Sequence, residues 1–520
     1  MNRRFGLWRA PLLMGLLAAG LLMDGAWHEV SAEGMSPASL VQLDELSREG
    51  QWLALLAAAD EGGKQSPAAA EPVIYKMRAL RLLGHLEPAR RLAREAATRF
   101  PDRADVWLEK AWAEVFIGDW QAGLADVRRA AVLQPQLAEA AILEGIIHRE
   151  AQDWPAAATA FDRADTLRPN DSLVLLNRGR IAVEQGRWAA AIDLLSRSLV
   201  LQTDSAEASF HRGRAYAANG DLPAASHDFT QAILLRPEVA APYVARAEIL
   251  ARAGMWARAA EDADTALALG AKSLSAHLVT CRAAEALEAW PGLERRAKGM
   301  ISAFPDEAQG YRFLFQALNS EGRAAEALQA CDEAVRLAPE DDLLRLERAA
   351  LKIALQQYAA AVDDCTAVLH REPLALGYAL RGLAWLRQHD LPRAEENAVN
   401  ALTLDSAAAT AHLVLAEVQL ARSQNAQALA SARRALHLAP QLSWAQVVYG
   451  QALLASGQSA EALQAASQVL SQSPANAQAY ALRARCYFVL GQKQAARADL
   501  DELVRLDPAL GQQVRAELLP

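Results

Sequence analysis

A 34-residue spacing of prolines runs through almost the whole chain and limits what it can fold into. The prolines are separated by 34 residues or by twice 34, and they are Pro67, Pro101, Pro135, Pro169, Pro237, Pro305, Pro339 and Pro373, followed, after a one-residue deletion near Leu374, by Pro440, Pro474 and Pro508. A self-similar period of this length is typical of stacked repeats, in which each unit contacts only its neighbours. The length of the chain therefore gives no guide to the number of domains.

One unit shows the logic of the repeat most clearly, from Ala206 to Pro237. The pattern predicts two short amphipathic helices that meet at Gly220. A small residue, Gly213, lets the two helix axes approach closely, and the bulky Phe229 fills the space beside it. Because neither helix could bury its apolar face alone, each unit needs its neighbours.

Independent positions repeat with the same period. The eighth position of the unit is small at Ala111, Gly145, Gly179, Gly213, Ala247, Ala349, Gly450 and Ala484. The fifteenth is glycine at Gly50, Gly84, Gly118, Gly186, Gly220, Gly254, Gly322, Gly457 and Gly491, which predicts a left-handed helix end. Prolines in the first turn of the second helix stand where a missing N–H costs least, at Pro155, Pro223, Pro291 and Pro392.

On these residues the chain resembles tetratricopeptide repeat proteins. The resemblance implies an all-α fold, a right-handed superhelical solenoid of about fourteen helix-turn-helix repeats. The repeats begin at Ser36, Ala70, Ala104, Ala138, Ser172, Ala206, Ala240, Leu274, Ala308, Asp342, Ala375, Ala409, Ser443 and Ala477.

We expect the repeats to form two arms, residues 36–273 with seven repeats and residues 308–510 with six. Residues 274–307 form an atypical repeat, because Cys281 and Glu288 stand where a small residue and the turn glycine are expected. We predict a change of curvature there. Residues 62–66 read as a loop that attaches the first repeat loosely, and residues 511–520 as a short helix that caps the last one.

The N-terminal residues 1–32 have the pattern of an export signal. Arg3, Arg4 and Arg9 precede an apolar run from Ala10 to Met23, and small residues up to Ala32 offer a cleavage site. A run of this length is shorter than the roughly 20 residues that span a bilayer, although the stretch could also be kept as a membrane anchor. We expect a bacterial protein that is periplasmic or exported, either soluble after cleavage near Ala32 or anchored in the inner membrane by an uncleaved segment.

Charge and motifs exclude several functions. The formal net charge is -9, so nucleic acid, which needs a basic surface, is not an expected partner. No catalytic, nucleotide-binding or metal-binding motif appears, so we expect no enzyme activity, cofactor or metal. His148, His211 and the Asp363-Asp364 pair are interpreted as helix-surface residues. The four cysteines, Cys281, Cys331, Cys365 and Cys486, fit buried packing positions.

The resemblance places function on the inner groove of the stack. In the family, the second, fifth, ninth, twelfth and thirteenth residues of each first helix line the concave face. Leu343 and Leu376 occupy such positions in this chain. The candidate partner-binding residues at these positions are Trp112, Phe116, Ile146, Arg180, Phe210, Arg214, Leu383, Leu386, Leu420, Trp444 and Leu454.

Three interpretations of these apolar positions stay open. The side chains could pack within the stack, the groove could close on itself, or a partner helix or extended peptide could lie in it. Arg180 and Arg214 would then hold a carboxylate of the partner, unless they pair with Glu184 and Glu207 on the protein itself.

The expected function is therefore a non-catalytic protein-protein interaction scaffold. Similar bacterial proteins serve as assembly factors for envelope machinery such as secretion systems, pili or exopolysaccharide export. The alternative is a carbohydrate-binding module of a polysaccharide export apparatus, in which Trp112 and Trp444 would stack on sugars. The mixed apolar groove favours a peptide over a polysaccharide.

Overall fold

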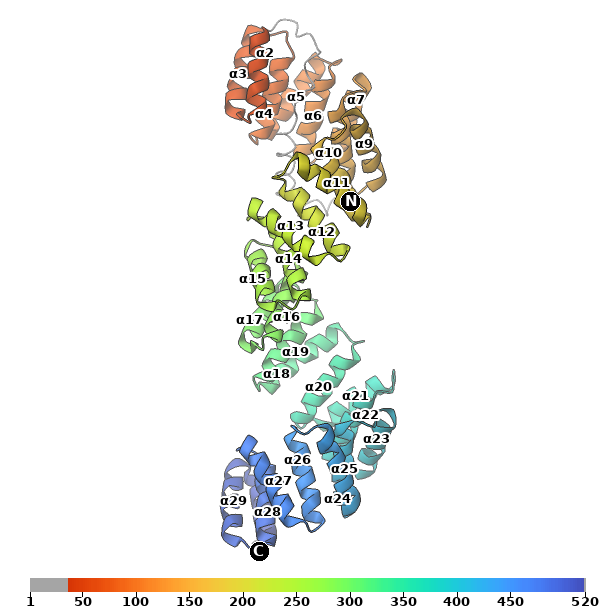
Figure 1. The fold of residues 1–520 in the computed structure, drawn as a ribbon, viewed down its shortest axis with the longest axis vertical. Helices are drawn as coiled ribbons and strands as arrows, with labels where there is room; N and C mark the ends of the chain where they lie inside the picture. The colour runs from red at the N-terminus through yellow and green to blue at the C-terminus, as the bar shows by residue number, and fades with distance from the viewer. Residues whose placement is uncertain (1–35, 519–520) are drawn as a thin grey trace. The chain divides into compact units, whose positions relative to one another are not determined.

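The computed structural model describes residues 36–518, and every regular element in that range is an α-helix (Figure 1). The 29 helices are α2 (Pro37–Arg48), α3 (Trp52–Gln65), α4 (Glu71–Leu82), α5 (Leu86–Arg99), α6 (Ala104–Ile117), α7 (Trp120–Leu133), α8 (Ala138–Glu150), α9 (Trp154–Leu167), α10 (Ser172–Glu184), α11 (Trp188–Leu201), α12 (Ala206–Ala218), α13 (Leu222–Leu235), α14 (Ala240–Arg252), α15 (Trp256–Ala268), α16 (Leu274–Ala286), α17 (Trp290–Ala303), α18 (Ala308–Ser320), α19 (Ala324–Leu337), α20 (Asp342–Ala354), α21 (Tyr358–Leu369), α22 (Ala375–Arg387), α23 (Leu391–Leu404), α24 (Ala409–Ala421), α25 (Asn425–Leu438), α26 (Ser443–Ala455), α27 (Ser459–Gln472), α28 (Ala477–Val489), α29 (Lys493–Leu506) and α30 (Pro508–Leu518).

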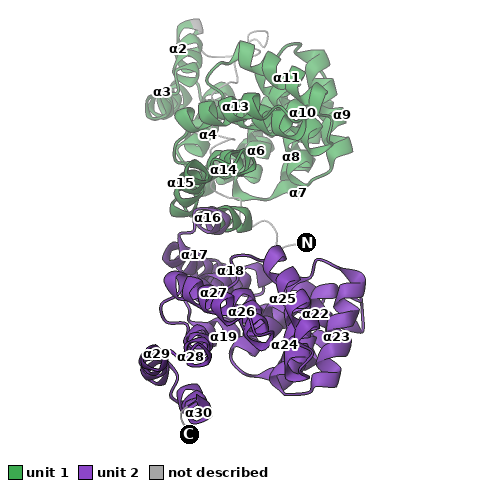
Figure 2. Ribbon diagram, turned by 60° about the horizontal axis from the view of Figure 1, so that its bottom comes forward, with its two compact units in different colours: residues 1–279 green, residues 280–520 purple. Residues whose placement is uncertain are grey.

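Successive helices form hairpins, and each hairpin packs on the next. Helix α12 packs on α13, α13 on α14, and the first helices of neighbouring hairpins, such as α10 and α12, also touch. The helices α2 to α29 make up the expected stack of helical hairpins, and the all-α repeat fold is confirmed. Figure 2 shows the two compact units into which the chain divides, residues 1–279 and 280–520.

The turn inside each hairpin uses a left-handed residue. All nine predicted turn glycines have a positive φ, for example +89° at Gly220. The hairpins that lack this glycine adopt the same conformation with another residue, at a steric cost. Those residues are Gln152, Glu288, Gln356, His389 and Ser423, with φ between 52° and 62°.

The small residue at the eighth position lets the two helices of a hairpin touch. A Cβ added at Gly213 would lie 2.7 Å from a ring carbon of Phe229, which is itself 1% exposed. Gly145 faces Phe161 in the same way, with 2.8 Å to its ring. The aromatic ring therefore occupies the space that the missing side chain leaves, as the sequence predicted.

A polar link also recurs inside the hairpins, between the seventh and the twenty-third positions. Arg212 Nε donates to Asp228 Oδ2 at 2.7 Å, and Arg212 Nη1 lies 3.1 Å from Ser196 Oγ of the preceding hairpin. One arginine thus ties three helices together. The same link is formed by Lys110 with Asp126, Arg246 with Asp262, Arg348 with Asp364, Arg381 with Asn397, and Arg483 with Asp499.

This polar link corrects one interpretation of the sequence. Asp364 was expected on the helix surface, but it is only 5% exposed. It accepts hydrogen bonds from Arg348 Nε at 2.9 Å and from Lys352 Nζ at 2.8 Å. Two cations therefore compensate the cost of burying the carboxylate.

The predicted helix ends are confirmed in most places. Pro155, Pro223, Pro291 and Pro392 all lie in the first turn of a second helix. Aspartate often caps that helix, as Asp221 does by accepting from the Ala224 amide at 3.1 Å.

Two expectations at the ends of the stack need correction. Residues 62–65 belong to α3 rather than to a loop, because Gly62 is buried against the first hairpin and packing outweighs the low helix propensity of glycine. The terminal helix begins at Pro508, earlier than expected, since proline is favoured at a first helical position. It buries Val514 and Leu518 against Leu500 and Leu503 of α29.

Other expectations fall outside what the structure tests. The N-terminal residues 1–32 lie outside the described residues. Within residues 36–518 no helix combines the length and apolar character needed to cross a bilayer. The two arms and the bend expected at residues 274–307 stay a prediction.

Candidate partner-binding surface

The first helices of successive hairpins lie side by side and form one face of each of the two compact units, residues 1–279 and 280–520. We call this surface the A-helix face. It comprises the second, fifth, ninth, twelfth and thirteenth positions of each repeat, which lie on the helices α2, α4, α6 and so on to α28. All eleven predicted partner-binding residues belong to this face. Their exposure differs strongly from one to another.

In the first unit the apolar candidates are packed within the stack. Trp112, Phe116 and Ile146 are only 1%, 6% and 2% exposed. The rings of Trp112 and Phe116 meet edge to face, 6.2 Å apart, and the Arg81 guanidinium lies 5.3 Å and 5.0 Å from their centroids. Arg81 reaches the two rings from the preceding hairpin, and Trp112, Phe116 and Ile146 all form part of the core. They follow the interpretation in which these side chains pack within the stack, and they are not open to a partner.

A buried charge cluster supports this core. Glu109, 2% exposed, accepts from Arg78 Nε at 2.8 Å and from Arg81 Nη2 at 3.1 Å. Burial by itself would raise the pKa of the Glu109 carboxyl, but the two guanidinium groups outweigh it and lower that pKa. Burial lowers the pKa of Arg81, although Glu109 opposes the change. Each of the three charges is therefore stabilised in the core by the charges of opposite sign beside it.

Arg180 and Arg214 pair with acidic residues of the protein itself. Arg214 Nη1 lies 2.8 Å from Glu184 Oε1, and Arg180 Nη1 bonds Glu207 Oε1. These are the intramolecular pairs that the sequence left open as an alternative. Half-buried Phe210 packs on Phe229, with 5.8 Å between the ring centroids.

His211, expected on the surface, is buried between these residues. The Phe210 ring lies edge to face with it, at 5.3 Å, and Arg214 Nη1 is 3.5 Å from its Nδ1. Burial lowers the pKa of His211 well below its ordinary value, and the positive charges of Arg180, Arg214 and Arg149 lower it further. The ring is therefore neutral at physiological pH, and its burial corrects the expectation.

In the second unit the structure brings several candidates together. Leu383, Leu386 and Trp444 pack in one cluster, and Leu420 and Trp444 both pack against the next. Leu386 is buried, whereas Leu383, Leu420, Trp444 and Leu454 are half-buried. This layer is tightly packed but reaches the surface.

The Trp444 ring is already engaged by polar neighbours. Its Nε1 donates to Glu417 Oε1 at 2.5 Å, and the Arg387 guanidinium lies 5.5 Å from the ring centroid. Arg387 Nη1 also binds Glu417 Oε2 at 2.9 Å. A sugar would have to displace this arginine to stack on the ring.

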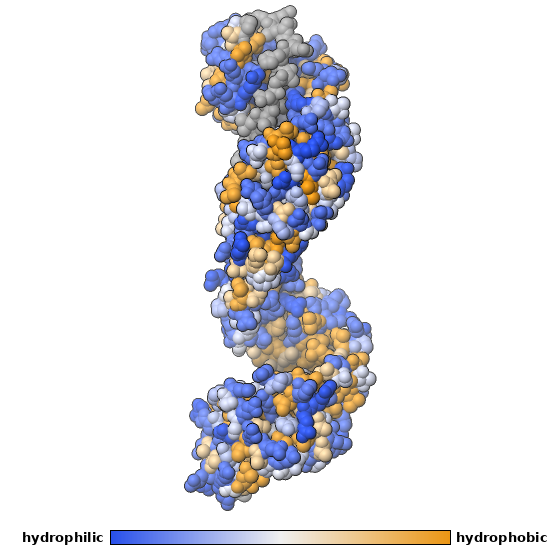
Figure 3. All heavy atoms as spheres, in the orientation of Figure 1, coloured by the Kyte–Doolittle hydropathy of each residue, from blue (hydrophilic) through white to orange (hydrophobic). Residues whose placement is uncertain are grey.

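Two leucines of the A-helix face are clearly exposed. Leu343 on α20 and Leu376 on α22 are 50% and 46% exposed and both occupy the second position of their hairpins. Figure 3 shows apolar residues gathered over the region of α20 to α22. The first helices α20 and α22 pack directly on one another. The two leucines therefore lie on neighbouring hairpins of the same surface.

The second helices of the first unit carry another apolar row. Val132, Val200 and Leu234 are 72%, 80% and 70% exposed and all hold the twenty-ninth position of their hairpins. The sequence did not predict this row, because the family resemblance marks only positions on the first helices. It is a rival to the A-helix face as a contact surface.

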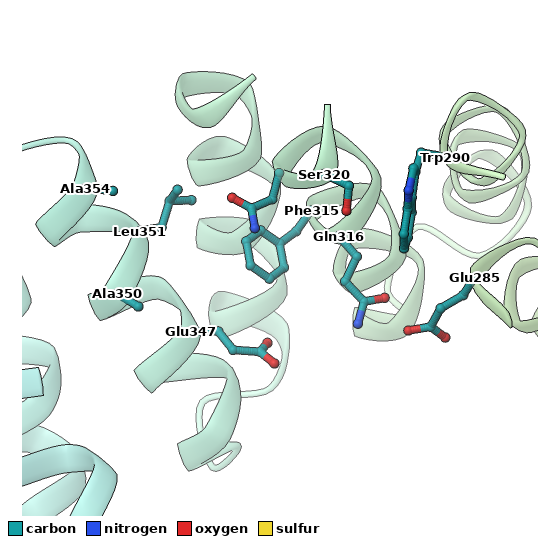
Figure 4. Close-up of a pocket in the computed structure, with 10 residues that line it drawn as sticks. Glu285, Trp290, Phe315, Gln316, Ser320, Glu347, Ala350, Leu351 and Ala354 are labelled. Atoms are coloured by element: carbon teal, nitrogen blue, oxygen red, sulfur yellow. The ribbon is translucent and has the colours of Figure 1, made fainter. Parts of the chain in front are cut away.

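A hollow of about 460 Å³ opens on the A-helix face of the second unit (Figure 4). Trp290 and Phe315 form apolar walls, and Glu285, Gln316 and Glu347 add polar groups. Figure 4 shows the side chains of Glu285, Gln316 and Glu347 pointing toward the same space. Glu285 and Gln316 stand at groove positions of the eighth and ninth hairpins, which the family pattern marks. Trp290 and Glu347 stand at positions that the pattern does not mark.

All four cysteines are buried, as expected. Burial raises the pKa of the Cys331 and Cys365 thiols to about 12 and that of Cys486 to about 11. Thiolate, the reactive form, is therefore scarce at neutral pH. Across residues 36–518 no three His, Cys, Asp or Glu side chains gather in a way that could hold a metal ion.

Several solved structures are similar to this chain. The APC/C hetero-tetramer Cut9-Hcn1 matches with a TM-score of 0.42 and 13% identity, over 94% of this chain and 97% of that one. PilF of Pseudomonas aeruginosa matches with a TM-score of 0.38 and 16% identity, over 40% and 96%. PilW, a type IV pilus biogenesis factor, matches with 0.37 and 16%, over 41% and 98%. All three TM-scores are below 0.5, so these likenesses carry no functional argument.

Family models give the assignment. A tetratricopeptide repeat model matches residues 108–172, 176–225, 212–273 and 379–443, and a second model of the same description matches residues 453–518. Together the matches cover more than half of the chain, and they coincide with the hairpins described above. The chain therefore belongs to the tetratricopeptide repeat family.

Proposed function

We propose that this protein-protein interaction scaffold holds a helix or extended segment of a partner protein on the A-helix face of its second unit, and that it has no chemistry of its own. The carrying observation is the pair of exposed leucines, Leu343 and Leu376, on first helices that pack together. Exposed apolar side chains arranged in a row mark protein contact sites when polar residues flank them.

The spacing of these leucines suits a helical partner. Packed helix axes lie about 8–10 Å apart. Seven residues of an α-helix rise about 10 Å, so apolar residues at i and i+7 of a partner helix match two neighbouring hairpins. The half-buried Leu383, Leu420 and Leu454 extend the apolar surface toward the C-terminus.

The carbohydrate alternative finds less support. Trp112 is buried, and Arg387 and Glu417 already engage Trp444. Sugar sites combine an open aromatic face with polar groups around it. Neither predicted tryptophan offers such a face.

The cellular setting belongs to the same proposal. Arg3, Arg4 and Arg9, the apolar run from Ala10 to Met23 and the small residues before Glu33 support export. We propose a periplasmic or exported assembly factor of the envelope, either cleaved near Ala32 or held at the inner membrane. N-terminal sequencing of the protein from fractionated cells tests this; a cytoplasmic protein with an intact N-terminus would contradict it.

Affinity capture with matched variants tests the surface. Leu343→Glu with Leu376→Glu should lose the partners that the wild type retains from native envelopes. Val399→Glu with Leu404→Glu, on the second helix α23, is the control, because these residues are 49% and 50% exposed. Circular dichroism should show the same helix content in all variants.

The rival surface has its own variant. Val200→Glu with Leu234→Glu removes the exposed row of the first unit. If this variant loses the partners while Leu343→Glu with Leu376→Glu keeps them, the proposed site is wrong.

A further inference from the structure

We infer that the hollow formed by α16, α17, α18 and α20 binds a cationic side chain, arginine or lysine, of the partner protein. This inference rests on the proposed scaffold function and adds a specificity site to it. The lining residues used in the argument are Glu285, Trp290, Phe315, Gln316 and Glu347.

Two buried acceptor atoms of the hollow have no hydrogen-bond donor within residues 36–518. Glu347 Oε2 and Gln316 Oε1 are buried and have no hydrogen-bond partner among the described residues. For the half-buried carboxylate of Glu285, no ion pair is found in the part of the chain that the structure describes. A buried acceptor without a donor costs about 1–3 kcal/mol, so an occupant that brings donors is favoured.

The local charge is negative. Arg312 Nη2 lies 3.3 Å from Glu347 Oε1, and Arg312 Nη1 lies 3.7 Å from Asp341. Arg312 is shared between Glu347 and Asp341, and Glu285 adds a third carboxylate, so the cluster carries more negative than positive charge. A guanidinium or ammonium group supplies both the charge and the donors.

The protonation of Glu347 agrees with this balance. Burial raises the pKa of its carboxyl; Arg312 opposes the rise, whereas Asp341 and Glu285 add to it. Arg312 therefore compensates the burial of this carboxylate only in part. A bound cation would offset the electrostatic repulsion between the carboxylates of Glu285 and Glu347.

The walls favour an organic cation over a simple ion. Trp290 is half-buried at the start of α17, and Phe315 is 6% exposed on α18. Aromatic faces attract guanidinium and ammonium groups within about 6 Å. The volume of about 460 Å³ lies within the range of about 300–1,000 Å³ typical of ligand sites and accommodates one long side chain. Exposed Asn319 and Ala354 line the hollow, which leaves a way in from solvent.

Two capped tripeptides that differ in one charge test the inference on the full-length chain. The probes are acetyl-Ala-Arg-Ala-amide and the same peptide with neutral citrulline in place of arginine. Saturation-transfer NMR gives the dissociation constants. We expect the arginine peptide to bind at least tenfold more tightly than the citrulline peptide.

Variants assign the binding to this hollow. Glu285→Gln with Glu347→Gln should weaken arginine-peptide binding at least tenfold, and Trp290→Phe should preserve more binding than Trp290→Leu. The control, Glu326→Gln with Glu340→Gln, removes the same charge from exposed carboxylates of the second unit and should leave binding unchanged.

Three results would overturn the inference: equal binding of the two peptides, no binding of the arginine peptide at millimolar concentration, or no effect of Glu285→Gln with Glu347→Gln. Loss of partners in the Leu343→Glu, Leu376→Glu variant would then still support the scaffold proposal. Retention of partners in that variant, combined with selective arginine binding, would instead overturn the proposed site and leave the hollow as a separate one.

Discussion

At the scale of single residues, the fifteenth position of the hairpin shows how strongly the repeat imposes a backbone conformation. Ser423 has a φ of 61° and His389 a φ of 62°, although both carry a Cβ. The left-handed conformation costs such residues roughly 1–2 kcal/mol. The free energy gained when the two helices of the hairpin pack together outweighs this local cost.

Replacing one of these residues with glycine should stabilise the protein. Ser423→Gly removes the left-handed penalty, partly offset by the greater chain entropy of glycine, and should raise the stability by up to about 1 kcal/mol. Chemical denaturation followed by circular dichroism measures the gain. Gln424→Gly is the control, because φ at this neighbouring residue is -85°, outside the left-handed region; an equal gain in both variants would contradict the account.

The buried carboxylate of Glu109 should stabilise the first unit in a pH-dependent way. Glu109→Gln leaves Arg78 and Arg81 without a counter-charge, which should cost about 3–5 kcal/mol at pH 7. Because the folded pKa of Glu109 is lowered, its contribution is complete above the ordinary carboxyl pKa of about 4.3 and is lost as the pH falls below that value.

Hydrogen exchange of α4 and α6 at pH 7 and in acid measures this effect. The wild type and the variant should differ most at pH 7 and converge in acid. The control is Glu61→Gln, since the Glu61 side chain is 60% exposed. A difference that grows on acidification would contradict the assigned role.

At the scale of the helical hairpin, close approach of the two helices depends on the eighth position. Gly213 and Phe229 fit together so tightly that an added methyl group has no room. The Arg212 link to Asp228 joins the same two helices, and its contact with Ser196 adds α11 of the preceding hairpin. Apolar packing and the polar link thus stabilise the same close arrangement of α12 and α13.

Adding one methyl group at this contact should destabilise the hairpin. Gly213→Ala forces the Phe229 ring or the helix axes to move, at a cost of about 1–3 kcal/mol. Thermal unfolding should show a lower midpoint. In the control, Gly299→Ala, the new Cβ meets nothing within 4 Å, so the higher helix propensity of alanine should leave the midpoint unchanged or raise it; a similar loss in both variants would contradict the packing argument.

The hairpin was largely predictable from the sequence because its signals are local. Gly220, Pro223 and the small Gly213 specify a turn, a helix start and a helix contact within a single repeat. The sequence left open whether Trp112 packs within the stack or faces a partner, because the answer depends on contacts with another hairpin, such as that of Arg81. The hollow combines Glu285, Trp290, Gln316 and Glu347 from three hairpins, and no spacing in the sequence reports their convergence.

At the scale of the whole molecule, a stack held by neighbour contacts should open locally rather than all at once. The buried thiols report on this directly. Cys331 and Cys365 lie in the ninth and tenth hairpins, which have neighbours on both sides, whereas Cys486 lies in the last hairpin, covered by α30.

The order of thiol exposure should follow position in the stack. In mild denaturant Cys486 should react with a thiol reagent faster than Cys331 or Cys365, because fewer hairpin contacts hold the end of the stack. Pulsed alkylation with mass spectrometry gives the rate at each site. Identical rates at all sites, tracking global unfolding, would contradict a neighbour-held stack.

The central claim is that a partner protein lies on the A-helix face of the second unit. Site-specific photocrosslinking in living cells tests it most directly, with p-benzoylphenylalanine placed at position 376 or, as the matched control, at position 399. We predict a covalent adduct with a partner polypeptide from position 376 and none from position 399. An adduct from position 399 alone would place the partner on the second helices and contradict the account.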